Sequence, residues 1–113
     1  MIIAFDTETT GRVDFKSRSS APHQPHLCSI AWIHASDAGE SEAEQIHYIK
    51  PDGWTVPPEV IPIHGLTTEF LAEHGKPLAD VLELFFTDIE QAAYRVAYNH
   101  GFDNKMVRIE QHR

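Results

Sequence analysis

The stretch IIAFDTETTG at residues 2–11 places two acidic residues at the end of an apolar run. The run predicts a short buried β-strand over residues 1–6. Side chains two residues apart on a strand point to the same face, so Asp6 and Glu8 can direct both carboxylates toward one point. The stretch therefore requires a fold in which a buried strand carries a carboxylate pair at its end.

Three other segments have the pattern of strands, at residues 27–34, 44–50 and 95–98. Short connections between the first three strands favour an antiparallel meander. We expect the last segment to lie beside the first strand and parallel to it. Residues 11–26 are rich in Ser, Pro and His and predict a long loop of the kind that is often functional or mobile.

Helix signals follow the third strand and the fourth. Residues 51–62 are expected to be irregular. A helix follows them, with Thr67 as a good N-cap and Gly75 at its end. Pro77 then opens a longer helix. A last amphipathic helix is expected from near Gly101. The apolar face of the longer helix consists of Leu78, Val81, Leu82, Phe85, Ile89 and Ala92. This order of elements predicts a mixed α/β fold with helices covering a sheet.

The length and charge of the chain limit its function. A chain of 113 residues suits one domain over residues 1–113. The net charge of -8 argues against a protein that coats nucleic acid without specificity. This negative charge is compatible with a metal-dependent nuclease, because bound cations supply positive charge at the site. No apolar stretch reaches membrane-spanning length, and the single Cys28 favours a cytoplasmic location.

A third acidic residue, Asp103, lies in the first turn of the expected last helix. If the fourth strand runs parallel to the first, Asp103 faces Asp6 and Glu8 across a small gap. At about 5 Å and an effective dielectric constant of about 20, each pair of carboxylates repels by roughly 3 kcal/mol. A bound Mg²⁺ or Mn²⁺ would offset this repulsion. The alternative is that these residues serve as turn, surface and helix-start residues.

The motifs FDTETTG at residues 5–11 and YNHGFD at residues 98–103 resemble those of the DEDD-type, DnaQ-like 3′–5′ exonucleases. This family includes the proofreading epsilon subunits of bacterial DNA polymerase III. The resemblance implies a ribonuclease H-like fold. It also implies hydrolysis of the 3′-terminal phosphodiester of single-stranded nucleic acid with two divalent cations, Mg²⁺ or Mn²⁺. We expect DNA rather than RNA as the substrate, and the sequence leaves the choice between them open.

The resemblance also implies roles for individual residues. Asp6, Glu8 and Asp103 match the first three acidic metal ligands of the family and are the expected catalytic residues. The family has a further motif with a fourth carboxylate and a general base, whereas this sequence stops at Arg113. We therefore expect the N-terminal two-thirds of an exonuclease domain, apparently truncated, with weak or no activity as this chain.

Substrate contacts are implied at a second set of residues, namely Thr9, Thr10, Gly11, His64, Asn99 and Phe102. Thr9 and Thr10 are alternatively turn residues. His64 is alternatively a loop histidine that binds backbone groups, and Phe102 is alternatively a packing residue.

Two main functions remain open on the sequence, beside a third and weaker interpretation as a small metal-free α/β domain whose motifs are coincidental. One is the exonuclease, and the other is a catalytically incomplete nucleic-acid-binding or polymerase-accessory module with the same fold. The expected partners are single-stranded 3′ ends, a DNA polymerase subunit and, as a further hypothesis, a second copy covering the sheet edge. Arg12, Lys16 and Arg18 in the long loop either contact phosphates or are simply solvated.

Overall fold

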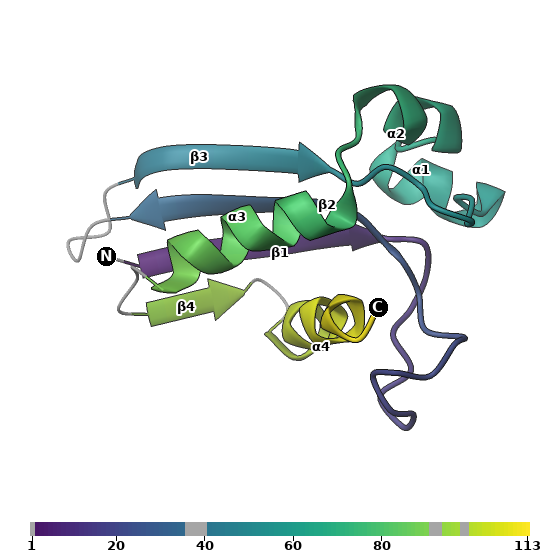
Figure 1. The fold of residues 1–113 in the computed structure, drawn as a ribbon, viewed down its shortest axis with the longest axis horizontal. Helices are drawn as coiled ribbons and strands as arrows, with labels where there is room; N and C mark the ends of the chain where they lie inside the picture. The colour runs from purple at the N-terminus through teal and green to yellow at the C-terminus, as the bar shows by residue number, and fades with distance from the viewer. Residues whose placement is uncertain (1, 36–40, 91–93, 98–99) are drawn as a thin grey trace.

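A computed structural model describes residues 2–35, 41–90, 94–97 and 100–113 of the chain. One four-stranded sheet is central to the fold, and α3 and α4 lie against the same face of it (Figure 1). The elements are β1 (Ile2–Thr9), β2 (Leu27–Ala35), β3 (Ser41–Tyr48), the 3₁₀ turn η1 (Pro58–Val60), α1 (Ile61–His64), α2 (Thr68–His74), α3 (Leu78–Glu90), β4 (Tyr94–Ala97) and α4 (His100–Gln111). The predicted α/β class is confirmed.

The sheet has the strand order β3-β2-β1-β4. β1 pairs with β2 and β2 with β3 in antiparallel fashion, whereas β4 runs parallel to β1. The predicted meander with a parallel fourth strand is therefore confirmed. β1 is longer than the predicted residues 1–6, because β2 continues to pair with it as far as Thr9, past an irregularity after Glu8.

The third strand also differs from its predicted limits of 44–50. It ends at Tyr48, and Ile49 instead forms an isolated bridge with Lys76. The backbone N–H of Ile49 donates to the carbonyl of Cys28 at 2.9 Å, and its side chain is buried. Ile49 thus leaves the edge strand to close the core, which period-two patterning does not reveal. The fourth strand ends at Ala97, within one residue of its predicted position, and residue 98 lies outside the described residues.

The predicted start and end of α2 are confirmed, although the physical reason for the glycine at its end differs from the predicted one. The hydroxyl of Thr67 accepts from the N–H of Phe70 at 3.1 Å, as an N-cap does. Gly75 ends α2 with an ordinary φ of -78°, but a Cβ there would lie 2.4 Å from the carbonyl oxygen of Leu71. Close packing, and not a left-handed conformation, requires glycine at that position.

Residues 51–62, predicted to be irregular, contain η1 and the start of α1. Pro58 and Pro62 lie in the first turns of these two elements, where a missing N–H costs nothing. Gly65 then ends α1 with a φ of 72°, the left-handed conformation that glycine adopts most easily. Clustered prolines therefore begin short helices here, and this places His64 at a helix end.

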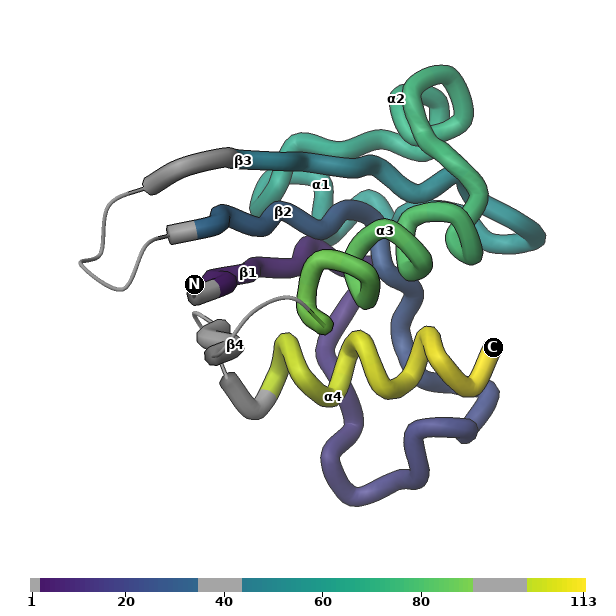
Figure 2. The backbone as a smooth tube through the Cα atoms, turned by 60° about the vertical axis from the view of Figure 1, so that its left-hand side comes forward, coloured from purple at the N-terminus to yellow at the C-terminus, as the bar shows by residue number. Residues whose placement is uncertain are grey.

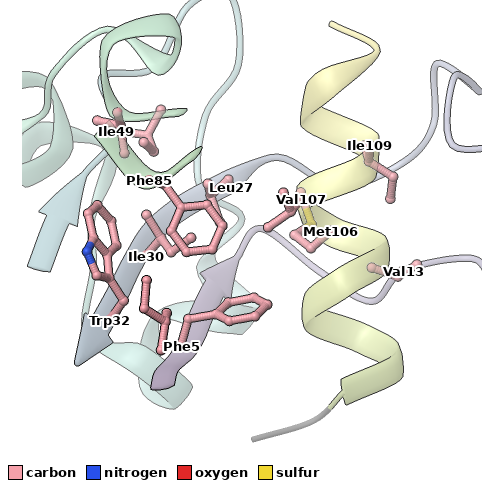
Figure 3. Close-up of a cluster of buried hydrophobic side chains, with 12 residues drawn as sticks. Phe5, Val13, Leu27, Ile30, Trp32, Ile49, Phe85, Met106, Val107 and Ile109 are labelled. Atoms are coloured by element: carbon pink, nitrogen blue, oxygen red, sulfur yellow. The ribbon is translucent and has the colours of Figure 1, made fainter. Parts of the chain in front are cut away.

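The main core lies between the sheet and the helices α3 and α4 (Figure 3). Phe5 contacts Phe85 edge-on at 5.1 Å between ring centroids, and Trp32 lies 5.2 Å from the same ring. The helix faces predicted from the sequence also supply core side chains, namely Leu78, Val81, Ile89, Phe102, Met106 and Ile109. Leu82, predicted on the same face, is only partly buried and is not part of this cluster, whereas the unpredicted Val107 is. Ala92, predicted on the same face, lies outside the described residues.

A smaller cluster contains Cys28, Val56 and Leu71 and packs β2 against α2. Burial raises the pKa of the Cys28 thiol to about 12, so this side chain is the inert apolar core residue predicted from its neighbours. Of the helices in the described ranges, none has the length and apolar character that crossing a membrane requires.

The segment between β1 and β2 passes the end of β1 and returns alongside α4 (Figure 2). Val13 from this segment is buried in the main core. The Nζ atom of Lys105 on α4 donates to the carbonyl of Ser17 at 3.2 Å. The predicted loop is therefore docked onto the body of the protein.

Candidate active site

β1 separates its side chains into two sets. Ile3, Phe5 and Thr7 are buried on the face covered by α3 and α4, whereas Asp6 is exposed and Glu8 is half-buried. This alternation follows from the pleat of the strand. The two carboxylates therefore share the sheet face opposite the main core, as the sequence predicts.

Asp103 reaches β1 from the first turn of α4. Its side chain is 1% exposed, and its Oδ1 accepts from the hydroxyl of Thr7 at 2.6 Å and from the N–H of Thr7 at 3.3 Å. The parallel ladder between β1 and β4 ends at the pair Phe5 and Ala97. The carboxylate thus occupies the edge of β1 just beyond the last residue of β4.

The three carboxylates influence one another electrostatically. Partial burial, and then the charge of Asp103, raise the pKa of Asp6. Partial burial is also the main cause of the raised pKa of Glu8, and the charge of Asp6 is the second cause. His64 lowers the pKa of Glu8, and the charge of Asp103 raises it by a smaller contribution. The site therefore concentrates negative charge, at a free-energy cost that the metal-free protein bears.

A cation site can be tested against this arrangement. Across the described ranges, no group of three or more His, Cys, Asp or Glu side chains is placed so that it could hold a metal ion. The donor set has the right chemistry, because carboxylate oxygens are the ligands of Mg²⁺ and Mn²⁺. The raised pKa values of Asp6 and Glu8 add an electrostatic reason to bind a cation. The residues therefore fit a divalent ion in their chemistry.

Thr7 is the residue that the sequence analysis missed. It lies between the two acidic residues and points to the other face, where its hydroxyl fixes Asp103. The only signal in the sequence is a hydrogen-bonding side chain at an inward position of an otherwise apolar strand face.

His64 joins α1 to the end of β1. Its Nδ1 accepts from the N–H of Leu66 at 3.1 Å, so its Nε2 carries the proton and donates to the carbonyl of Thr9 at 3.0 Å. The histidine thus binds backbone groups, which is the alternative considered from the sequence. Its place next to Glu8, whose pKa it lowers, keeps the predicted substrate contact open.

The two threonines after Glu8 also hold the turn. The Thr9 hydroxyl donates to the carbonyl of Gly11 at 2.7 Å, and the Thr10 hydroxyl accepts from the N–H of His26 at 2.9 Å. A Cβ added at Gly11 would meet nothing within 4 Å, and its φ is not left-handed. Neither packing nor backbone conformation therefore requires glycine at this position.

The second predicted motif is described in part. Phe102 is partly buried and packs against the main core, as its alternative role predicts. Asn99 lies outside the described residues. Its predicted contact with substrate stays a prediction.

Comparison with protein families gives a match over nearly the whole chain. The model of the RNase_T exonuclease family matches residues 3–113. The DNA polymerase III subunit epsilon of Pasteurella multocida (strain Pm70) is 32% identical over 102 residues. That alignment covers 89% of this chain and 38% of the relative, so the chain spans well under half of the relative's length.

Solved structures share the fold. A structure of exonuclease I superimposes with a TM-score of 0.77 at 19% identity, covering 94% of this chain and 22% of that one. E. coli exonuclease I in complex with a dT13 oligonucleotide gives 0.76 at 18% identity, with coverages of 94% and 22%. A moderately thermophilic exonuclease I from Methylocaldum szegediense gives 0.77 at 20% identity, with coverages of 93% and 22%. These matches confirm the ribonuclease H-like fold that the sequence motifs imply.

Proposed function

Because this chain belongs to the RNase_T exonuclease family, we propose that it is a 3′–5′ exonuclease domain acting on single-stranded DNA. The bond broken is the 3′-terminal phosphodiester. The observation that carries the proposal is that Asp6 and Glu8 share one sheet face, where burial first and then neighbouring carboxylates raise the pKa of both. The relative from Pasteurella multocida is a DNA polymerase III subunit, so a polymerase subunit is the proposed protein partner.

Asp6, Glu8 and Asp103 would hold two divalent cations, Mg²⁺ or Mn²⁺. When bound, such cations supply a hydroxide nucleophile and stabilise the charge that develops on the phosphate. The contribution of Thr7 is to orient Asp103, since both of its hydrogen bonds go to Oδ1. The contribution of the sheet is to hold Asp6 and Glu8 on a rigid strand.

The terminal nucleotide is proposed to lie along Thr9, Thr10 and Gly11. The support is the glycine that neither packing nor conformation requires, because its missing side chain leaves room for close approach of a ligand. His64 fixes the carbonyl of Thr9 and so positions the end of β1 next to this space. Asn99 and Phe102 complete the proposed contacts.

Calorimetric titration with Mn²⁺ tests the metal ligands. We expect Asp6→Asn and Glu8→Gln each to lower the Mn²⁺ affinity by at least about tenfold. Asp80→Asn, at an exposed position on α3, is the matched control and should bind as the wild type does. Equal Mn²⁺ affinity in the wild type and both site variants would refute the proposal.

Digestion of end-labelled oligonucleotides tests the polarity. Any Mn²⁺-dependent activity should shorten a 5′-labelled single strand stepwise from its 3′ end and be lost in Asp6→Asn. Release of the 5′ label as the first product would contradict the proposed direction.

A second candidate function is a nucleic-acid-binding or polymerase-accessory module without catalysis. Two observations favour it. The buried Asp103 accepts a hydrogen bond from Thr7. Among the described residues, no group of acidic, His or Cys side chains is arranged to hold a metal ion. Retained DNA binding with no Mn²⁺ binding would support this module over the enzyme. Pairing of two copies at the sheet edge stays a prediction that light scattering can test.

A further inference from the structure

The loop between β1 and β2 has a charge opposite to that of the protein. Residues 11–26 contain three of the nine Lys and Arg residues and one of the 17 acidic residues, in a chain of net charge -8. The three basic residues, Arg12, Lys16 and Arg18, are all exposed. A polyanion that approaches this acidic protein is therefore attracted to the loop.

The loop has a defined internal structure. Gln24 is 2% exposed, and its side chain lies at the centre of the loop. Its Oε1 accepts from the N–H of Asp14 at 3.0 Å, while its Nε2 donates to the carbonyls of Asp14 and Arg18 at 2.9 Å and 3.2 Å. One buried amide thus fixes the backbone from which the exposed basic side chains project.

The single acidic residue of the loop is engaged within it. The Asp14 carboxylate accepts from the N–H of Lys16 at 3.0 Å and the hydroxyl of Ser17 at 2.8 Å, and it lies 2.9 Å from Nε2 of His23. These contacts, that of His23 first, lower the pKa of Asp14 to about 2. Asp14 therefore acts as a structural anion that orders the loop.

The loop is attached to both elements that supply the carboxylates. It begins where β1 ends, and Thr10 and His26 exchange backbone and side-chain hydrogen bonds across its base. At its far side Lys105, two residues beyond Asp103, donates to the carbonyl of Ser17. A nucleic-acid strand whose 3′ end lies at Asp6 and Glu8 therefore has this loop as a neighbour.

The loop also exposes an aromatic ring. Phe15 is 61% exposed, whereas Val13, two residues earlier, is buried in the main core. Exposing a phenylalanine on an ordered loop offers no gain in folding free energy. An exposed aromatic ring beside basic side chains is the combination on which proteins stack and hold single-stranded nucleic acid.

We propose that Phe15, Lys16 and Arg18 form a platform for the part of a single DNA strand that leads away from its 3′ end. This inference rests on the proposed function, because that function places the 3′ end at Asp6 and Glu8. A base stacks on Phe15, and Lys16 and Arg18 contact phosphates. The order imposed by Gln24 and Asp14 lowers the entropy lost when the strand binds.

Fluorescence anisotropy of a 5′-labelled 12-nucleotide oligo-dT, measured in EDTA to prevent hydrolysis, tests the platform. We expect Phe15→Ala to weaken binding about tenfold, the scale of one stacked base. The double variant Lys16→Gln/Arg18→Gln should reduce the slope of log affinity against log salt concentration by about 1.4, for two phosphate contacts. Leu84→Ala and Lys76→Gln, which alter an exposed apolar and an exposed basic residue outside the loop, are the controls and should bind as the wild type does.

The outcomes separate this inference from the proposed function. The Mn²⁺ titration of Phe15→Ala should match the wild type, because Phe15 is not a proposed ligand. If the wild type binds Mn²⁺ but does not bind the oligonucleotide, or if Phe15→Ala binds it unchanged, the platform is refuted and the exonuclease proposal stands. Equally tight binding of labelled poly-glutamate, also unaffected by Phe15→Ala, would identify a general anion surface and likewise refute the platform.

Discussion

The two faces of β1 differ in what their side chains do. On the inner face, Phe5 packs against Phe85 and Thr7 binds Asp103. On the outer face, Asp6 and Glu8 carry charge that destabilises the metal-free protein, since each has a raised pKa. One eight-residue strand therefore holds the fold together with one face and presents the proposed chemistry with the other. Substitutions on the two faces should separate stability from metal binding.

The largest effect is expected where the inner face meets α3. Phe85→Ala removes a fully buried ring that contacts Phe5 and Trp32, and it should lower the free energy of unfolding by about 3–5 kcal/mol. Leu84→Ala, at the adjacent and 43% exposed position, should cost less than about 1 kcal/mol. Urea denaturation measures both. Equal losses would show that α3 does not bury the face described here.

Thr7→Val should have the next largest effect on stability, and this inner-face substitution should affect metal binding as well. The change keeps the shape of an inner-face residue but removes the hydroxyl donor to a buried carboxylate, at a cost of about 1–3 kcal/mol. It should also weaken Mn²⁺ binding, since Asp103 loses its orientation. Thr87→Val, which removes an exposed hydroxyl on α3, is the control. A Thr7→Val protein with unchanged unfolding and unchanged Mn²⁺ titration would contradict this role.

The pH dependence of the stability of the metal-free protein tests the contribution of the outer face of β1. A raised pKa means that the folded state binds these protons more tightly than the unfolded state. Asp6 and Glu8 therefore contribute stability at low pH that is lost as the pH rises through their folded pKa values. In EDTA at pH 7 the double variant Asp6→Asn/Glu8→Gln should melt about 2 °C above the wild type, a small shift because both side chains are partly solvated.

Near the ordinary pKa values of 3.8 and 4.5, this difference in melting temperature should shrink. Comparing variant with wild type at each pH cancels the opposite contributions of Asp14 and Asp88, whose pKa values are lowered. A double variant that melts below the wild type at pH 7 would show that the two carboxylates stabilise the metal-free fold.

The smallest effect on stability is expected at Gly11. Gly11→Ala should change the free energy of unfolding by less than about 0.5 kcal/mol, because the site has open space and no left-handed backbone. Gly65→Ala, at a φ of 72°, should cost about 1 kcal/mol. Only Gly11→Ala is expected to weaken the binding of thymidine 5′-monophosphate in Mn²⁺. Loss of stability in Gly11→Ala would assign this glycine to folding instead.

The shared face of Asp6 and Glu8 and the position of Asp103 at a helix start follow from the sequence because the relevant rules are local, whereas metal binding by the three residues stays a prediction. Period-two alternation puts Asp6 and Glu8 together, and a helix-start pattern places Asp103 near the end of the fourth strand. The role of Thr7 is not local, because its partner lies 96 residues away. The order of the loop is hidden for the same reason: a polar, proline-containing segment is typical of a mobile loop, and its order is seen only in tertiary features such as the burial of Val13 and Gln24.

The bond between Thr7 and Asp103 also has a consequence for the nascent chain. Asp6 and Glu8 leave the ribosome early, whereas Asp103 follows about a hundred residues later. The three carboxylates can therefore come together only after residue 103 has been synthesised. Because its members come from distant stretches of the polypeptide, the proposed site is complete only after α4 has packed against the β-sheet.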